Sequence, residues 1–133
     1  GAGTLLAGDL GCLLNIADSL RKVLREHAPE VCVIESLFYA QNLQTALIMG
    51  EARGASLVAV AEAGLEIYEM APRRVKQAIV GYGGAQKLAV AKMVQRMLAL
   101  DETPAPDAAD ALALALTHAQ TVGRGLLATP KRL

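Results

Sequence analysis

Stretches of helical periodicity alternate with short runs of β-forming residues, and this alternation limits the possible folds more than any other feature. Val31-Cys-Val-Ile34 is a continuous apolar run, as expected of a buried parallel strand, and Leu65 to Met70 predicts another strand. Helical patterns precede, separate and follow these runs. The order helix, strand, helix, strand, helix predicts an α/β fold with a mainly parallel sheet flanked by helices.

Residues that favour helix ends set the expected boundaries. Pro29 lies just beyond the first helix, Asn42 can cap the second, and Pro72 occupies the permitted first turn of the third. The expected elements before the first long strand are a short strand at Thr4–Leu6, a turn at Gly8–Gly11 and a helix to about His27. Those after it are helices from Asn42 to about Ala63, Pro72 to Val80, Ala85 to Leu100 and about Asp107 to His118, with a loop at Gly81–Gly84.

Length and composition fit one domain with an aliphatic core. The chain has 133 residues, of which 53% are apolar but only 3% aromatic. Apolar stretches such as Ala55–Ala61 are too short to span a bilayer, and the start shows no signal peptide. The cysteines, Cys12 and Cys32, are too few for a disulfide framework or a zinc site, which favours a cytoplasmic location. We expect a domain over residues 1–123 and a basic, flexible tail over residues 124–133.

Charge is balanced overall but unevenly distributed. The 13 basic and 13 acidic residues give a net charge of zero, yet residues 70–100 contain no acid. The basic residues of this segment are Arg73, Arg74, Lys76, Lys87, Lys92 and Arg96. Such a segment can bind a polyanion. On charge alone, the simpler interpretation is that these are ordinary solvated positions on two helices.

Three acids have placements that suggest chemistry. Glu35 follows the apolar strand directly, at the sheet edge where open α/β folds bind ligands. Asp107 and Asp110 are three residues apart at the start of an Ala- and Leu-rich helix, hence on one face. Carboxylates of this kind can hold Mg²⁺, and paired ions activate water for phosphodiester cleavage. For Asp107 alone, the favoured alternative is stabilisation of the helix dipole.

Gly50 and Gly54 lie four residues apart on one face of a long helix. Because glycine weakens a helix, two on one face indicate close packing of another helix against it.

Four segments together resemble the RuvC-type Holliday-junction resolvases, in that family's order and approximate spacing. They are Val31-Cys-Val-Ile-Glu35-Ser-Leu-Phe38-Tyr-Ala-Gln-Asn42, Gly50-Glu-Ala-Arg-Gly54, Ala71 to Lys87, and Asp107-Ala-Ala-Asp110 to His118. Each motif is modest alone. Their joint occurrence over almost the whole chain is specific.

The resemblance implies a ribonuclease H-like homodimer that resolves four-way DNA junctions by paired nicks dependent on Mg²⁺, for which Mn²⁺ can substitute. It implies that Glu35, Asp107 and Asp110 are catalytic metal ligands. The implied DNA-binding residues are Phe38, which would stack at the opened crossover, together with Arg73, Arg74, Lys76 and Lys87. A branch-migration helicase complex is an implied partner.

The chain departs from the family pattern near its start. The family's first metal ligand is an Asp in a Gly-hydrophobic-Asp-Pro-Gly strand, and that motif does not occur here. Gly8-Asp9-Leu10-Gly11 is similar only superficially, since Asp9 precedes Glu35 by too short a stretch for two further strands. We therefore expect an N-terminally incomplete domain, and expect that these residues alone bind metal weakly and do not cut.

Two alternatives remain open. The first is a catalytically incomplete module that binds junctions or dimerises. The second, less favoured because four ordered motifs coincide, is an α/β domain that binds a small molecule. His118 and Cys12 are interpreted as structural.

Overall fold

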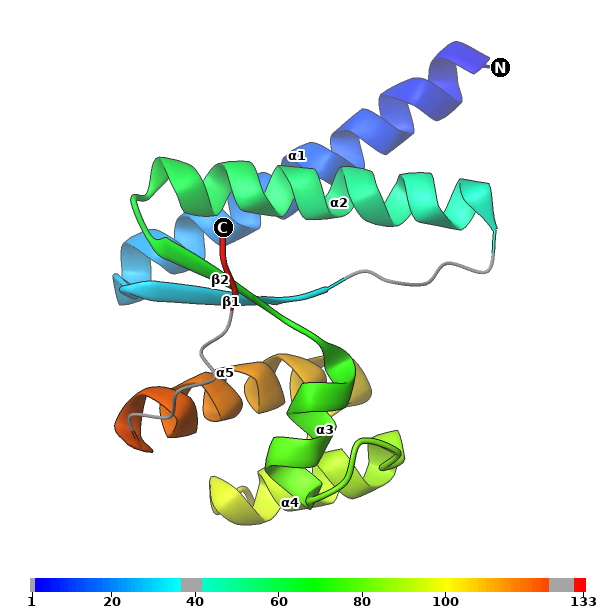
Figure 1. The fold of residues 1–133 in the computed structure, drawn as a ribbon. Helices are drawn as coiled ribbons and strands as arrows, with labels where there is room; N and C mark the ends of the chain where they lie inside the picture. The colour runs from blue at the N-terminus through cyan, green and yellow to red at the C-terminus, as the bar shows by residue number, and fades with distance from the viewer. Residues whose placement is uncertain (1, 37–41, 125–130) are drawn as a thin grey trace. The chain divides into compact units, whose positions relative to one another are not determined.

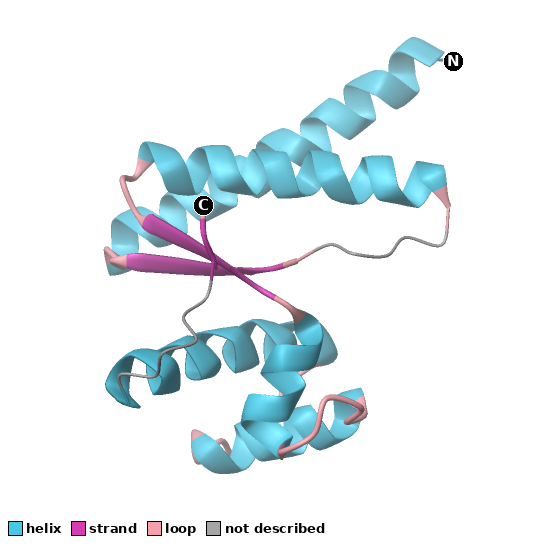
Figure 2. Ribbon diagram, viewed as in Figure 1, coloured by secondary structure: helices cyan, strands magenta, loops and turns pink. Residues whose placement is uncertain are grey.

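The computed structural model describes residues 2–36, 42–124 and 131–133. The helices are α1 (Ala2–His27), α2 (Leu43–Glu62), α3 (Pro72–Val80), α4 (Lys87–Met97) and α5 (Pro106–Arg124). The strands are β1 (Val31–Glu35), β2 (Glu66–Met70) and β3 (Lys131–Arg132). Figure 1 follows these elements along the chain, and Figure 2 separates the helices in cyan from the strands in magenta.

The strands form one sheet in the order β1-β2-β3. The backbone N–H of Glu66 donates to the carbonyl of Glu30 (3.4 Å), and that of Ser36 donates to the carbonyl of Met70 (3.0 Å). These bonds advance in the same direction on β1 and β2, so the two strands run parallel. β3 pairs antiparallel with β2, with Tyr68 opposite Arg132. The mixed sheet agrees with the predicted, mainly parallel arrangement of the long strands.

The chain divides into two compact units, which are described separately. Unit 1 comprises residues 1–32 and 37–67, and unit 2 comprises residues 33–36 and 68–133. In unit 1, α1 packs along α2 with Ala17, Ala59 and Val60 buried. Arg21 of α1 donates to the carboxylate of Glu62 on α2 (Nε to Oε2, 3.1 Å).

Unit 2 has an aliphatic core built by α3, α4 and α5. Its buried members are Met70, Val75, Ile79, Ala85, Val90, Val94 and Ala113. Among the described residues, the buried members of this core include no aromatic residue, in line with the composition. The core holds α3, α4 and α5 at the end of β2, where Met70 is 2% exposed.

Several predicted boundaries are confirmed because their signals are local. The side chain of Asn42 accepts the N–H of Thr45 (2.8 Å) and caps α2, while Gly64 has a positive φ of 79° just beyond the helix. Pro72 is the first residue of α3. The loop at Gly81–Gly84 is also where the sequence placed it.

The strand predicted at Thr4–Leu6 and the turn at Gly8–Gly11 are wrong, since α1 runs through both. Ala2, Leu5 and Leu6 are helix formers, and no proline interrupts the segment. A glycine costs only about 1 kcal/mol in a helix, so Gly8 and Gly11 do not end it.

The predicted ends of the last two helices need correction. α4 is shorter than Ala85–Leu100. Its N-cap, Gln86, has an extended backbone, so the helix begins at Lys87, and it ends at Met97, shortly before Ala99 adopts a positive φ of 53°. α5 continues beyond His118 to Arg124. The hydroxyls of Thr117 and Thr121 donate to the carbonyls of Ala113 and Thr117 (2.8 and 2.9 Å), so these polar residues are satisfied inside the helix.

The basic tail predicted over residues 124–133 includes β3, which the composition did not indicate. Residues 125–130 of that tail lie outside the described residues. None of the helices in the part of the chain that is described is long and apolar enough to cross a membrane.

Candidate active site: an acid pair with two lysines

The end of β1 fixes the position of Glu35. The four residues before it are half-buried, and Ser36 after it is buried and bonded through its N–H to Met70 at the end of β2. The strand therefore cannot shift along its neighbour without breaking this bond. Glu35 itself is exposed, so its carboxylate stands at the end of the strand, as the sequence predicted.

The start of α5 brings Asp110 near the same place. Asp107 lies in the first turn and is exposed, whereas Asp110 lies one turn further along and is half-buried. One carboxylate oxygen of Asp110 is 3.7 Å from the Nζ atom of Lys87, the first residue of α4. The Lys87 side chain is 72% exposed, so this ion pair is well hydrated and adds little to stability.

Glu35 interacts electrostatically with Asp110. Partial burial raises the pKa of Glu35, and the negative charge of Asp110 raises it further. The positive charges of Lys87 and Lys76 act in the opposite direction and lower this pKa. Glu35, Asp110, Lys76 and Lys87 therefore form one interacting group, which we call the acid–lysine cluster.

The cluster is suited to hold a cation and an anion together. The negative charge of Asp110 disfavours ionisation of Glu35, and a divalent cation between the two carboxylates would offset this repulsion. Oxygen is the ligand atom that Mg²⁺ prefers. The lysines supply charge for a phosphate. Within residues 2–36, 42–124 and 131–133, however, no group of three or more His, Cys, Asp or Glu side chains is arranged to hold a metal. The three-acid ligand set with Asp107 thus stays a prediction.

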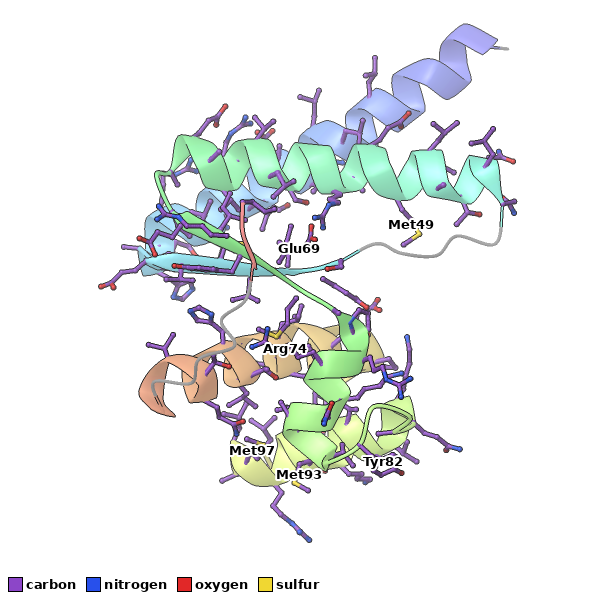
Figure 3. The ribbon with its side chains drawn as sticks, viewed as in Figure 1. Met49, Glu69, Arg74, Tyr82, Met93 and Met97 are labelled. Atoms are coloured by element: carbon purple, nitrogen blue, oxygen red, sulfur yellow. The ribbon has the colours of Figure 1, made fainter. Side chains whose placement is uncertain are left out.

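The remaining predicted DNA-binding residues lie on or near α3. Lys76 and Arg74 are half-buried on this helix, and Figure 3 labels Arg74 there. Arg73 is exposed at its start, and its side chain crosses the loop that follows the helix. Phe38, the predicted stacking residue, lies outside the described residues.

Gly83 was not singled out by sequence reasoning, yet it shapes this surface. A Cβ atom at Gly83 would lie 2.5 Å from Cγ and 2.8 Å from Nε of Arg73. The missing side chain therefore makes room for the Arg73 side chain. The signal in the sequence is the density of glycine in Gly81-Tyr82-Gly83-Gly84, which is more than a turn requires.

His118 was interpreted as structural and lies against Tyr68 of β2, with ring centroids 4.9 Å apart. Its Nδ1 atom is buried and has no hydrogen-bond partner among the described residues. Cys12 is exposed on α1 and Cys32 is half-buried in β1, and neither forms a disulfide.

Comparisons with known proteins find relatives of one family. The family model described as "Crossover junction endodeoxyribonuclease RuvC" matches residues 10–118. The chain is 46% identical over 110 residues to the protein of that name from Chloroflexus aggregans, covering 82% of this chain and 67% of the relative. It is 49% identical over 104 residues to that from Bordetella parapertussis, covering 78% of this chain and 57% of the relative. The chain thus spans roughly three fifths to two thirds of these relatives.

Two solved structures of RuvC from Thermus thermophilus are also similar. They are 42% identical to this chain, and each alignment covers 91% of this chain and 72% of the other. The TM-score is 0.79 for one structure and 0.83 for the other, which is a complex with a Holliday junction substrate.

Proposed function

Because the chain belongs to the family of RuvC crossover junction endodeoxyribonucleases, we propose that the protein carrying it resolves four-way DNA junctions by paired, metal-dependent nicks. The ribonuclease H-like α/β fold expected from the resemblance is the fold of this family. The acid–lysine cluster is the observation that carries the proposal to particular residues.

In this proposal Glu35 and Asp110 hold a divalent cation, with Asp107 as a further ligand from the same helix face. Mg²⁺ fits a site of carboxylate oxygens, and Mn²⁺ can replace it. When bound, the ion activates water and stabilises the charge that develops on a phosphodiester. The contribution of the chain is to hold these carboxylates at the end of β1 and the start of α5.

The lysines of the cluster bind the DNA backbone. Lys87 already faces a carboxylate at 3.7 Å, so a phosphate near Asp110 would meet a cation that neutralises it. Lys76 belongs to the same cluster, because its positive charge lowers the pKa of Glu35. Arg73 and Arg74 extend the basic surface along α3, and Phe38 is the proposed stacking residue at the crossover. The junction-bound structure from Thermus thermophilus supports a junction as the substrate.

The second candidate is a module that binds junctions or dimerises without cutting. It is favoured by one observation, that no three acids among the described residues are arranged around a metal. A homodimer, a branch-migration helicase partner, a cytoplasmic location and the division into a domain (1–123) and a tail (124–133) belong to the proposal as well.

Binding of a labelled synthetic four-way junction, measured by fluorescence polarisation over a range of salt concentrations, tests the DNA surface. Lys76→Ala and Lys87→Ala should each weaken binding and reduce the salt slope by about one, the value for one lost phosphate contact. Lys22→Ala is the matched control, because Lys22 is an exposed lysine on α1 outside the basic segment. Equal effects from all three variants would show that the cluster has no special role in binding.

A further inference from the structure

A groove of about 570 Å³ lies in unit 2 beside α4 and is separate from the acid–lysine cluster. Its lining residues are Val80, Ala89, Lys92, Met93, Gln95, Arg96, Ala99 and Leu100. Most of them are apolar, and the two charged ones are both cationic. We call this feature the α4 groove.

The cations of the α4 groove point away from the acid–lysine cluster. Successive residues of an α-helix are about 100° apart, so Lys92 and Arg96 lie roughly 140° and 180° around the axis from Lys87. Lys87 faces Asp110 on α5. A ligand held by Lys92 and Arg96 therefore binds another side of the helix from the one that faces the acids.

A hydrogen-bond network keeps one wall of the groove in place. Lys92 Nζ donates to Thr103 Oγ1 (2.8 Å), and that hydroxyl donates to Oε1 of Gln95 (2.6 Å). Nε2 of Gln95 donates to the backbone carbonyls of Leu100 and Asp101 (3.3 and 3.4 Å). The segment after α4 is thus tied back to the helix, and the groove exists before any ligand binds.

The apolar lining of the groove includes Met93 and Leu100, and two further apolar residues of the same segment, Met97 and Leu98, are not part of the lining. Met93 and Met97 are one turn apart on α4 (Figure 3), and methionine side chains adjust to varied partners. Met97, Leu98 and Leu100 are each more than a third exposed. An apolar strip bordered by basic residues is complementary to a partner surface whose apolar residues are bordered by acidic ones.

We propose that the α4 groove binds an acidic amphipathic helix of a partner protein. Its apolar side chains would contact Met93 and Leu100, and its flanking carboxylates would meet Lys92 and Arg96. A DNA backbone fits less well, because phosphates gain nothing from an apolar lining. Charge complementarity decides the sign of the partner, since no acidic residue lines the groove and none occurs between residues 70 and 100.

The probe for the test is a fluorescein-labelled helical peptide of about four turns, with leucine at i, i+3, i+4 and i+7 spacing and glutamate beside the leucines. A second peptide carries lysine in place of every glutamate. Fluorescence anisotropy with the whole chain should show saturable binding of the acidic peptide only. Amide chemical shifts should change at Ala89, Met93 and Ala99, which line the groove.

The double variant Lys92→Glu, Arg96→Glu should bind the acidic peptide about tenfold more weakly. The matched control is Lys22→Glu, Arg25→Glu, which makes the same charge change at exposed positions of α1 and should leave binding within about twofold. Thermal unfolding checks that both variants fold, and Lys92→Gln, Arg96→Gln replaces the first if it does not.

Three results would each overturn the proposal: no saturable binding of the acidic peptide, equal binding of the two peptides, or equal loss in both double variants. Stoichiometric displacement of the peptide by a four-way junction would instead assign the groove to DNA. The outcome is independent of the proposed nuclease function, because no residue of the acid–lysine cluster is changed.

Discussion

At the scale of single residues, the environment of Glu35 combines partial burial with a second acid. Both raise the pKa of its carboxyl group, and the two lysines offset only part of this effect. A carboxylate in this setting costs stability when it is ionised, which is typical of residues kept for function.

The pH dependence of stability tests this environment. A pKa raised in the folded state means that the folded protein binds the proton more tightly than the unfolded chain, so stability is lost as pH rises from the ordinary value of about 4.5 through the raised value. Glu35→Gln removes this loss. It should stabilise the protein at pH 7 by a few tenths of a kcal/mol, about one degree in Tm, because the site is partly solvated.

Thermal unfolding of Glu35→Gln and the unchanged protein at pH 4 and pH 7 provides the measurement. The difference in Tm should shrink toward pH 4. Glu102→Gln, at an exposed position of unit 2, is the control and should show no such trend. The assigned environment would be contradicted if the Tm of Glu35→Gln, measured relative to the unchanged protein, were lower at pH 7 than at pH 4.

Gly83 gives a second prediction at this scale. In Gly83→Ala the new Cβ atom would lie 2.5 Å from Arg73 Cγ, so the Arg73 side chain must move. Junction binding should weaken as much as in Arg73→Ala, while Tm changes by only a few degrees because the loop is near the surface.

Gly84→Ala is the matched control for Gly83→Ala. Its nearest contact would be Tyr82 Cδ2 at 3.9 Å, an ordinary distance. Equal effects of the two substitutions on binding would mean that the loop, and not the placement of Arg73, matters.

Site residues could be predicted where their immediate sequence neighbours mark them as unusual. Glu35 and Asp110 are recognisable because an acid directly after an apolar strand, or a turn deep in an apolar helix, is unusual. Their proximity follows from the rule that strand ends and neighbouring helix starts meet at one sheet edge. The packing of Arg73 over Gly83 could not be predicted, because it depends on a contact between a helix start and the loop after that helix.

At the scale of elements, α2 has an exposed apolar face. Five exposed residues lie on one side of this helix, each within about 40° of their mean direction around its axis. They are Leu43, Leu47, Gly50, Gly54 and Val58. A Cβ atom at Gly50 or Gly54 would meet nothing within 4 Å. The predicted close packing at these glycines is therefore not made by the described part of this chain. We propose that this face of α2 forms the two-fold interface of the homodimer that the resemblance implies.

Gly54→Leu tests that interface. Within one chain the new side chain enters open space, so the fold should be unharmed, and helix propensity rises by about 1 kcal/mol. At a close helix–helix contact it would separate the partners. Sedimentation equilibrium should show a dimer for the unchanged protein and about tenfold or more weaker dimerisation for Gly54→Leu.

Gln44→Leu is the control for Gly54→Leu, since Gln44 is exposed on α2 roughly 80° around the helix axis from Gly54. A strictly monomeric unchanged protein, or equal effects of the two substitutions, would refute the interface.

The boundaries of elements were predictable where side chains act on their own backbone, as Asn42 and Pro72 do. The start of α1 and the strand β3 were not. α1 continues through Gly8 and Gly11 because nothing competes with the helix there, and β3 consists of residues paired with a distant strand. The extent of α1 depends on whether another structure competes with the helix, and β3 depends on a partner strand far away in the sequence. A local sequence pattern contains neither kind of information.

At the scale of the whole molecule, the order of four motifs was more informative than any one of them. The family match over residues 10–118 includes all four, although each motif has an ordinary structural interpretation by itself. Net charge was uninformative, since a neutral total concealed the basic segment from residue 70 to residue 100.

The central claim is that Glu35, Asp107 and Asp110 make this protein a junction-cutting enzyme, and Mg²⁺-dependent nicking of a synthetic four-way junction tests it most directly. The assay uses the chain preceded by the family's first strand, whose Asp we expect to be needed. Glu35→Gln, Asp107→Asn and Asp110→Asn should each lower the rate of paired nicking by about a hundredfold or more, with folding and junction binding kept. The matched controls Glu102→Gln and Asp101→Asn, at exposed positions of unit 2, should retain activity. Undiminished paired nicking by Glu35→Gln or Asp110→Asn would contradict the claim.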